Sequence, residues 1–316
     1  MPEQFTDRIP CRVLTGPTAS GKSDLALRLA REMNWEIICM DSMQIYRRMD
    51  IGTAKPTAEE RKLVPHHMID ILEPTESFSV AEYRVRAEEV VRKIRQEKGR
   101  DVLFVGGTGL YLQALMHPMT MGQVPADENL RNELRRTAET EEGKRSLHEQ
   151  LRQMDPATAD RLPVGDVRRI IRAIEVTRLT GIPFSRQPQR EENADTGFSW
   201  TVAALCMERT ALYERINRRV ERMVREGLPE EVRALLREGV PEDAQSMNGI
   251  GYRQMIPFVR GEISLEEAVR EIQLASRHYA KRQMTFLRRE ESVIWLDAMQ
   301  PDLYETLKER MLETNE

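Results

Sequence analysis

Short apolar runs alternate with longer amphipathic stretches through the first third of the chain. The runs at 11–15 (CRVLT), 36–40 (EIICM) and 102–105 (VLFV) have the length and the flanking residues of buried strands. Between them, residues 23–33 and 82–98 carry apolar side chains at helical spacing. Strands that alternate with helices are typical of an α/β fold, in which helices flank both faces of a parallel sheet.

The middle of the chain lacks this strand pattern. Residues 126–180 predict consecutive polar helices, with breaks at Gly143, Pro156 and Pro163. We therefore expect an all-helical insertion domain over residues 117–198.

The strand pattern then returns. Residues 199–207 (SWTVAALCM) and 292–296 (SVIWL) predict two further strands. Helices are expected in the two segments 210–240 and 264–289. The core domain is accordingly expected to comprise residues 1–116 and 199–316.

The composition is that of a soluble globular protein. The 316 residues are 40% hydrophobic and 32% charged, and the net charge is −4. A nucleic-acid partner would therefore have to meet local basic patches rather than a basic chain. The polar N-terminus does not resemble a signal peptide, and no apolar run is long enough to span a bilayer, so we expect a cytoplasmic protein.

The cysteines and histidines predict neither a disulfide framework nor a zinc site. Cys11, Cys39 and Cys206 lie far apart, which is typical of small buried side chains. His66 and His67 have no third ligand at a suitable spacing, so a structural role is expected.

Residues 16–23 (GPTASGKS) match the phosphate-binding pattern G-x-x-x-x-G-K-[ST], after a predicted strand and before a predicted helix. Backbone N–H groups of such a loop point at an anion, Lys22 adds a positive charge, and the Ser23 hydroxyl can ligate Mg²⁺. The predicted diphosphate-binding residues are Gly16, Pro17, Thr18, Ala19, Ser20, Gly21, Lys22 and Ser23.

The residues that follow neighbouring strands bear on which phosphate compound binds. The strand at 102–105 ends in Gly106, whereas many P-loop enzymes that use ATP have an acidic Mg²⁺ ligand there. Asp41 follows the second strand, at the sheet edge where ligands bind. It is placed to accept a proton or to assist a metal, or alternatively to cap a turn. The glycines of residues 106–109 permit close approach of a ligand, or a plain tight turn.

Basic residues are concentrated in three segments despite the acidic total. Residues 276–289 carry five Lys or Arg side chains and no acidic residue. Tyr279 and Phe286 are interleaved with them. Residues 161–178 carry five arginines against two acids, and a third cluster lies at 215–219. Basic groups beside aromatic rings suit a phosphate backbone with splayed-out bases, although a solvated helix face can have the same composition.

Six segments of the chain occur together in one known family. They are GPTASGKS at 16–23, DSMQIYR at 41–47, DIGTAKP at 50–56, GGTGLY at 106–111, GYRQM at 251–255 and AKRQMTFLR at 280–288. With them the chain resembles the tRNA dimethylallyltransferase family, also called tRNA isopentenyltransferases, of the bacterial type. The resemblance runs over nearly the whole chain.

The resemblance implies a P-loop NTPase-like fold that holds a diphosphate. It implies transfer of a dimethylallyl group from dimethylallyl diphosphate to N6 of an adenosine, assisted by Mg²⁺. That adenosine lies immediately 3′ of the anticodon, at position 37, in tRNAs that read codons beginning with U. The implied partners are tRNA, bound in part by the helical insertion, and dimethylallyl diphosphate. No membrane and no protein partner are expected, and the chain is expected to be a monomer.

The same resemblance implies roles for individual residues. Asp41 is the general base on N6, Lys22 and Arg219 contact the leaving diphosphate, and Ser23 holds Mg²⁺ with Asp41 as a second candidate ligand. The residues implied in tRNA binding are Asp41, Ser42, Met43, Gln44, Thr108, Arg131, Arg168, Arg169, Arg172, Asn248, Gly251, Tyr252, Arg253, Lys281, Arg282, Gln283, Phe286 and Arg288. Asn248 stands where some members of the family carry Arg.

Three other functions are compatible with parts of the sequence. An adenylate isopentenyltransferase would use the same donor with a free nucleotide, but it would need neither the insertion nor the basic clusters. A small-molecule kinase would bind ATP in the P-loop, and the missing acid after residues 102–105 disfavours it. A non-catalytic tRNA-binding protein would need neither the P-loop nor Asp41.

Overall fold

A computed structural model describes residues 8–117, 124, 126–187 and 197–313. The N-terminal segment that does not resemble a signal peptide lies largely outside these residues. The chain folds into two compact units: unit 1 comprises residues 1–116 and 195–316, and unit 2 comprises residues 117–194. In the described part of the chain, no helix combines the length and the apolar character that crossing a membrane requires.

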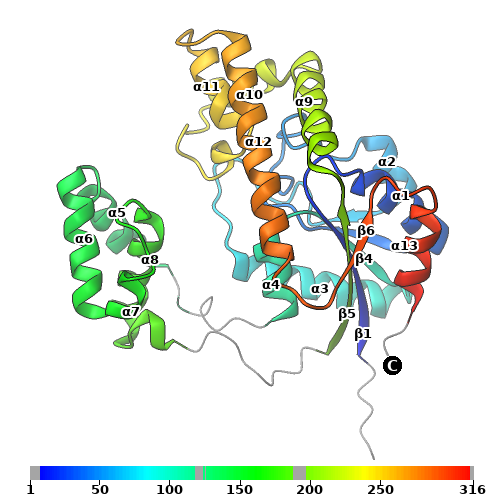
Figure 1. Ribbon diagram of the computed structural model, residues 1–316, viewed down its shortest axis with the longest axis horizontal. Helices are drawn as coiled ribbons and strands as arrows, with labels where there is room; N and C mark the ends of the chain where they lie inside the picture. The colour runs from blue at the N-terminus through cyan, green and yellow to red at the C-terminus, as the bar shows by residue number, and fades with distance from the viewer. Residues whose placement is uncertain (1–7, 118–123, 125, 188–196, 314–316) are drawn as a thin grey trace, which may run out of the picture. The chain divides into compact units, whose positions relative to one another are not determined.

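Unit 1 is built on a six-stranded parallel sheet with the strand order β3-β2-β4-β1-β5-β6. Figure 1 labels its strands β1, β4, β5 and β6. Its strands are β1 (Ile9–Thr15), β2 (Glu36–Cys39), β3 (His66–His67), β4 (Val102–Val105), β5 (Phe198–Cys206) and β6 (Val293–Asp297). The five predicted strands and the α/β fold are thus confirmed. β3 was not predicted, because two residues are too few to show a periodic pattern.

The helices of unit 1 alternate with these strands. They are α1 (Lys22–Met33), α2 (Ala58–Leu63), α3 (Val80–Lys98), α4 (Gly109–Met116), α9 (Arg209–Arg225), α10 (Leu228–Arg237), α11 (Tyr252–Val259), α12 (Leu265–Leu287), α13 (Leu303–Leu312) and the short 3-10 helix η3 (Ser246–Asn248). Local sequence sets the ends of α3: Ser79 and Glu82 form a reciprocal capping box, and Gly99 ends the helix with φ 62°.

Successive side chains of β1 and β4 belong to two hydrophobic cores on opposite faces of the sheet. Val13 and Phe104 belong to one buried cluster. Leu14 and Leu103 belong to another. Because successive side chains on a strand point to opposite faces, helices cover both faces of this sheet, as predicted.

Three central strands end at the same edge of the sheet. Leu14 of β1 and Cys39 of β2 both pair with Val105 of β4. The P-loop, Asp41 and Gly106 follow these three strand ends, so they leave the sheet side by side.

Unit 2 is helical in its described residues. Its elements are α5 (Glu128–Thr137), α6 (Glu141–Met154), α7 (Pro156–Ala159), α8 (Val167–Thr180) and the 3-10 helix η2 (Phe184–Arg186). Apolar side chains from α5, α6, α7 and α8 form one buried core, which includes Leu134, Leu147, Leu151, Ile170 and Ile174. The predicted helices of this segment are therefore confirmed.

The predicted helix break at Gly143 is wrong. Gly143 lies in the first turn of α6, where its N–H donates to Thr140 Oγ at 3.0 Å. A Cβ on Gly143 would come 1.7 Å from the carbonyl oxygen of Thr137. Glycine thus permits close approach of α6 to the end of α5, and the break falls before the capping residue Thr140.

Candidate active site

Two glycines shape the P-loop between β1 and α1. Gly16 has φ 135°, and a Cβ there would lie 2.7 Å from the carbonyl oxygen of Leu205. Gly21 has φ 95° and directly precedes the first helical residue, Lys22. Glycine is favoured at both positions because other residues rarely adopt such φ values. The loop presents the amino end of α1, where unpaired N–H groups and the helix dipole favour an anion.

Lys22 is partly buried in the loop and lies within electrostatic reach of Arg219 and Asp41. Its Nζ donates a hydrogen bond of 2.7 Å to the carbonyl oxygen of Pro17. Burial and the Arg219 guanidinium lower the pKa of Lys22 to about 7, against the opposing effect of Asp41. Burial also lowers the pKa of Arg219, again opposed by Asp41. The structure therefore brings the three predicted catalytic residues together at the P-loop.

The carboxylate of Asp41 caps a turn at the end of β2. Its Oδ1 accepts the backbone N–H groups of Met43 at 2.8 Å and Gln44 at 3.3 Å. From the described residues, Oδ2 accepts no hydrogen bond. The two readings of Asp41 are thus compatible, because one oxygen holds the turn and the other is available to a substrate.

The glycine-rich loop after β4 packs on the end of β2. A Cβ on Gly106 would lie 2.0 Å from the carbonyl oxygen of Met40. Thr108 Oγ1 accepts the N–H of Ser42 at 3.2 Å, directly after Asp41. The first glycine therefore serves close packing of two strand ends, and the loop fixes the segment that carries Asp41.

Helix α12 contributes basic side chains and one buried amide. Lys281, Arg282 and Arg288 are exposed, as nucleic-acid binding requires. Gln283 is only 6% exposed, and its amide contacts the P-loop and the glycine-rich loop. The prediction that Gln283 binds tRNA is therefore corrected, since its side chain faces inward. Phe286 lies so close to Gly109 that a Cβ on Gly109 would come 2.4 Å from its ring.

Tyr252 is also buried rather than exposed. Its side chain is inaccessible, and its hydroxyl donates a 2.6 Å hydrogen bond to Glu231. Burial and the Glu231 carboxylate raise the pKa of Tyr252 above its ordinary value. The prediction that Tyr252 binds tRNA is therefore corrected to a structural role. Gly251, with φ 101°, begins α11 beside it, and Arg253 is exposed.

Other predicted tRNA contacts have defined local partners. Asn248 is exposed, and its Nδ2 donates to the carbonyl oxygen of Ala244 at 3.0 Å. Met43 packs against Gly249. A Cβ on Gly249 would come 2.7 Å from the sulfur of Met43. Gln44 Nε2 donates to the carbonyl oxygen of Thr53 at 3.1 Å. Gln44 thus supports residues 50–56 in this structure.

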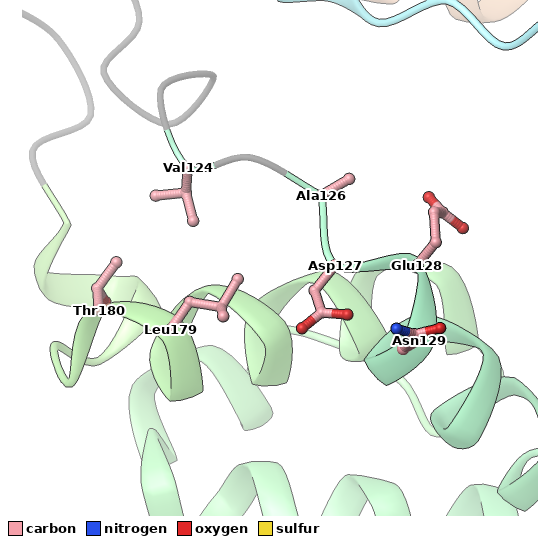
Figure 2. Close-up of a pocket in the computed structure, with 7 residues that line it drawn as sticks. All are labelled: Val124, Ala126, Asp127, Glu128, Asn129, Leu179 and Thr180. Carbon is pink, nitrogen blue, oxygen red and sulfur yellow. The ribbon is translucent and has the colours of Figure 1, made fainter.

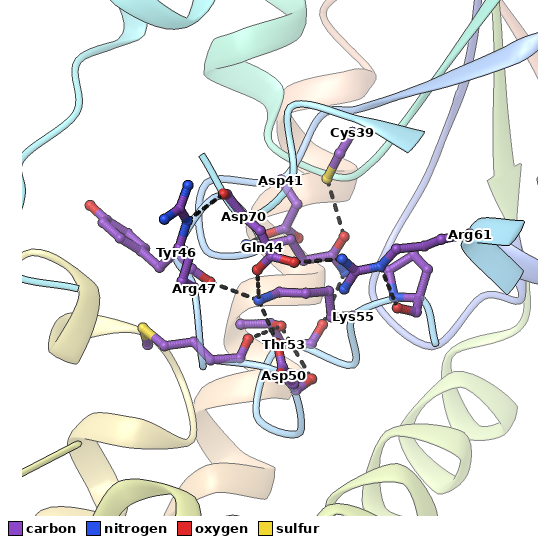
Figure 3. Close-up of polar contacts among 12 residues, drawn as sticks. Cys39, Asp41, Gln44, Tyr46, Arg47, Asp50, Thr53, Lys55, Arg61 and Asp70 are labelled. Atoms are coloured by element: carbon purple, nitrogen blue, oxygen red, sulfur yellow. Dashed lines mark hydrogen bonds and ion pairs between the residues drawn. The ribbon is translucent and has the colours of Figure 1, made fainter. Parts of the chain in front are cut away.

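A buried lysine anchors the segment at 50–56 (Figure 3). Lys55 Nζ donates to the carbonyl oxygen of Tyr46 at 2.7 Å and to the carboxylates of Asp50 at 2.6 Å and Asp70 at 2.7 Å. Burial would raise the pKa of Asp70, but the hydrogen bonds from Lys55 and Arg61 outweigh it and hold that pKa below its usual value. The buried amine of Lys55 therefore holds the segment at 50–56 in place near Asp41.

Four arginines predicted to bind tRNA belong to unit 2. Arg168 and Arg169 are exposed on α8. Arg131 and Arg172 instead contact the buried carboxylate of Glu175, at 2.8 Å and 2.6 Å. The guanidinium of Arg131 therefore joins α5 to α8, and that of Arg172 pairs within α8, while Arg168 and Arg169 are open to a partner.

An open hollow of about 710 Å³ lies on unit 2 (Figure 2). It is lined by Val124, Ala126, Asp127, Glu128, Asn129, Leu179 and Thr180. Asp127 Oδ1 caps α5 by accepting the N–H of Leu130 at 3.0 Å. The hollow contains none of the predicted catalytic residues.

Sequence reasoning missed two residues at the site. Burial, together with the nearby Asp41 carboxylate, raises the pKa of Tyr279 to about 12. Arg215 places Nη2 3.3 Å from the position of a Cβ on Gly21. Both lie in or beside the basic clusters of the sequence, but neither was predicted to belong to the site. The helical spacing of Tyr279 and Gln283, four residues apart, was the signal that they share a face.

Comparisons with known proteins agree with this arrangement. The family model for IPP transferase matches residues 44–290. A tRNA dimethylallyltransferase of Pelotomaculum thermopropionicum is 47% identical over 287 residues, covering 91% of this chain and 90% of that protein. One from Halalkalibacterium halodurans is 43% identical over 296 residues, covering 94% and 93%.

Solved structures show the same similarity. The full-length tRNA isopentenylpyrophosphate transferase of Bacillus halodurans matches with a TM-score of 0.69 and 40% identity, over 96% of each chain. A eukaryotic dimethylallyltransferase acting on tRNA matches with a TM-score of 0.77 over 95% of this chain and 77% of that chain. At 23% identity, that second likeness supports the fold alone.

Proposed function

The chain belongs to the IPP transferase family, and from this premise we propose that it transfers a dimethylallyl group to tRNA. The donor is dimethylallyl diphosphate. The acceptor atom is N6 of the adenosine immediately 3′ of the anticodon, in tRNAs that read codons beginning with U.

The observation that carries this proposal is the meeting of Lys22, Arg219 and Asp41 at the P-loop. Two cations beside the loop amides suit a leaving group on which negative charge grows. A carboxylate suits a nucleophile that must lose a proton. A kinase of this fold would be expected to have an acid after β4, where this chain has Gly106.

The reaction exchanges one bond for another. The bond from the allylic carbon to the diphosphate oxygen breaks, and a bond from that carbon to N6 forms. Lys22, Arg219 and the loop N–H groups stabilise the departing diphosphate while the carbon has partial cation character. The free Oδ2 of Asp41 takes the proton that N6 loses, late in the step because the exocyclic amine is a weak nucleophile.

The residues at the start of α1 fit a magnesium ion bound through the substrate. Ser23 is exposed beside the P-loop, and its hydroxyl is a hard oxygen ligand. Mg²⁺ commonly takes one or two protein ligands together with substrate phosphates. Ser23 would hold it, with Asp41 as a second candidate, and the ion would neutralise charge on the diphosphate.

The acceptor reaches the site along exposed basic side chains of α12 and of the residue that follows it. Lys281 and Arg282 on the helix and Arg288 after it suit the phosphates of an anticodon stem-loop. Arg168 and Arg169 of unit 2 supply further exposed positive charge. The target base has to leave the anticodon-loop stack so that its N6 atom can lie beside Asp41.

A free adenylate acceptor is the alternative that an experiment must exclude. Relatives with more than 40% identity over most of the chain are tRNA enzymes, which favours tRNA. A mononucleotide would also leave the exposed basic side chains without a function. ATP as a phosphoryl donor is disfavoured by Gly106, as described above.

The test is a labelling experiment. Dimethylallyl diphosphate with a radioactive allyl group is offered with tRNA, with AMP, and alone, each with and without added Mg²⁺. We expect label in tRNA only, and loss of transfer when Mg²⁺ is chelated. Label in AMP but not in tRNA would refute the proposal.

The proposal includes a cytoplasmic enzyme that acts as a monomer. The three predicted catalytic residues all come from one chain, so no second copy is needed to complete the site. Size-exclusion chromatography with light scattering, carried out with and without tRNA, tests the monomer.

A further inference from the structure

The amide of Gln283 joins the two loops that form the candidate site. Gln283 lies on α12, and its Oε1 accepts the N–H of Thr18 in the P-loop at 2.9 Å. Its Nε2 donates to the carbonyl oxygen of Gly107 at 2.9 Å. The amide therefore uses its oxygen on the P-loop and its nitrogen on the glycine-rich loop.

These contacts continue as far as Asp41, the predicted general base. Gly107 is followed by Thr108, whose Oγ1 accepts the N–H of Ser42 at 3.2 Å. Ser42 directly follows Asp41, whose Oδ1 holds the next turn. A path of hydrogen bonds and peptide bonds thus runs from the P-loop, through Gln283, to Asp41.

Packing leaves this amide little freedom to move. Gln283 is 6% exposed, and a Cβ on Gly107 would come 2.0 Å from its Nε2. The glycine at 107 is therefore required by Gln283 rather than by a ligand. A buried amide that is hydrogen-bonded through both its oxygen and its nitrogen holds the two groups that it joins in one arrangement.

We propose that Gln283 is a positioning residue that sets the distance between the leaving diphosphate and the acceptor amine. The inference rests on the proposed function: the P-loop holds the diphosphate, and Asp41 holds N6. The transferred carbon has to lie between them, and a misplacement of about 1 Å can cost about 100-fold in rate. Because the amide acts through the two loops, its removal lowers turnover more than substrate binding.

The first test replaces the amide with a side chain of similar length that forms no strong hydrogen bond. Gln283→Met is expected to lower kcat about 10- to 100-fold, while the Kd values for dimethylallyl diphosphate and tRNA change less than about threefold. Gln273→Met is the matched control, because Gln273 is a half-buried residue of the same helix outside this path. Unfolding curves of both variants separate loss of turnover from loss of fold.

Two outcomes would overturn the inference. The first is an unchanged kcat in Gln283→Met. The second is a loss confined to the Kd for tRNA, which would restore Gln283 as a tRNA-binding residue. The wild-type control keeps the two proposals distinct. If the wild-type protein transfers no label to tRNA, the proposed function is wrong. If the wild-type protein is active and Gln283→Met is equally active, only the positioning role is wrong.

The second test is a rescue by protonation in Gln283→Glu. A protonated carboxyl can accept from Thr18 and donate to Gly107, as the amide does, whereas an ionised carboxylate cannot donate. Burial favours the protonated form, so it is accessible at mildly acidic pH. The kcat of this variant, divided by that of wild type, is expected to rise as the pH falls. A ratio that does not change with pH would contradict the role of the Gly107 contact.

Discussion

The hydroxyl of Tyr252 donates a hydrogen bond of 2.6 Å to Glu231, and this carboxylate also holds the start of the segment at 50–56. The same carboxylate accepts three consecutive backbone N–H groups of residues 50–52, at 2.8 to 3.1 Å. Gly52 packs against the tyrosine ring, where a Cβ would come 2.5 Å from a ring carbon. The segments at 50–56 and 251–255 therefore form one joint beside the candidate site.

Removal of this hydroxyl is expected to affect stability rather than tRNA binding. Tyr252→Phe removes one hydrogen-bond donor from the Glu231 carboxylate, so the free energy of unfolding is expected to fall by about 1–2 kcal/mol. The Kd for tRNA is expected to change less than about twofold, because the ring does not reach the surface. Chemical denaturation and filter binding measure the two quantities. A tenfold weaker Kd at unchanged stability would restore Tyr252 as a tRNA contact.

Asp41→Asn separates the two roles of the Asp41 carboxylate. Asparagine retains an oxygen for the N–H groups of Met43 and Gln44, so the turn is expected to persist. It cannot accept the proton of N6, and kcat is expected to fall about 100- to 10,000-fold with both Kd values nearly unchanged.

Asp297→Asn is the control for this substitution. Asp297 ends β6, and its Oδ1 accepts the N–H of Met299 at 2.9 Å, which is the same kind of turn. Its kcat is expected to equal that of wild type. If Asp41→Asn weakened tRNA binding as much as turnover, the assignment of Asp41 as the base would be wrong.

The sequence predicted the residues whose chemistry follows from their place at a strand end. Asp41 and the P-loop belong to this group, because a parallel sheet brings the ends of its central strands to one edge. Gln283 and Tyr252 were assigned to tRNA because they lie in segments shared with the family. A shared segment does not reveal which side chain of a helix faces inward. That orientation depends on the packing of α12 and α11, which involves residues distant in the sequence.

The pKa of Lys22 predicts a pH dependence of donor binding. Burial and Arg219 lower this pKa to about 7, so the amine loses its charge as the pH rises above about 7. Only the protonated amine attracts the diphosphate, so the Kd for dimethylallyl diphosphate is expected to increase up to about tenfold per pH unit above that point. Titration calorimetry from about pH 6 to about pH 9 measures it.

The matched variant is Lys22→Arg. A guanidinium remains charged over this range, so its Kd is expected to vary little with pH, although binding is weaker because the contact geometry differs. A wild-type Kd that stayed constant above pH 7 would show that Lys22 is fully charged when the donor binds.

Arg282 provides a test of the nucleic-acid surface on α12. Arg282→Ala removes an exposed guanidinium, so tRNA binding is expected to weaken and the slope of log K against log salt to become shallower by about 0.7–0.9. Arg310→Ala on α13 removes an exposed arginine that is paired with Glu313, and its slope is expected to match wild type. An unchanged slope for Arg282→Ala would place the tRNA elsewhere.

Glu175 predicts a pH dependence for the stability of unit 2. Burial would raise the pKa of this carboxyl, but hydrogen bonds from Arg172 and Arg131 outweigh burial and hold it below the usual value near 4.5. A carboxyl with a lowered folded-state pKa stabilises the fold above its unfolded pKa, and this contribution disappears as the pH falls through the folded pKa. Glu175→Gln is expected to destabilise unit 2 by about 3 kcal/mol at pH 7, because two arginines lose their buried counter-charge.

Hydrogen exchange on the full chain can localise this effect. Amides of α5 and α8 are expected to exchange faster in Glu175→Gln at neutral pH, while those of β1 and β4 in unit 1 remain as in wild type. The difference between variant and wild type is expected to shrink below about pH 4, where the wild-type carboxylate is progressively protonated. Equal exchange of α5 and α8 at neutral pH would mean that Arg131 and Arg172 do not depend on Glu175, and would leave both guanidiniums available to tRNA.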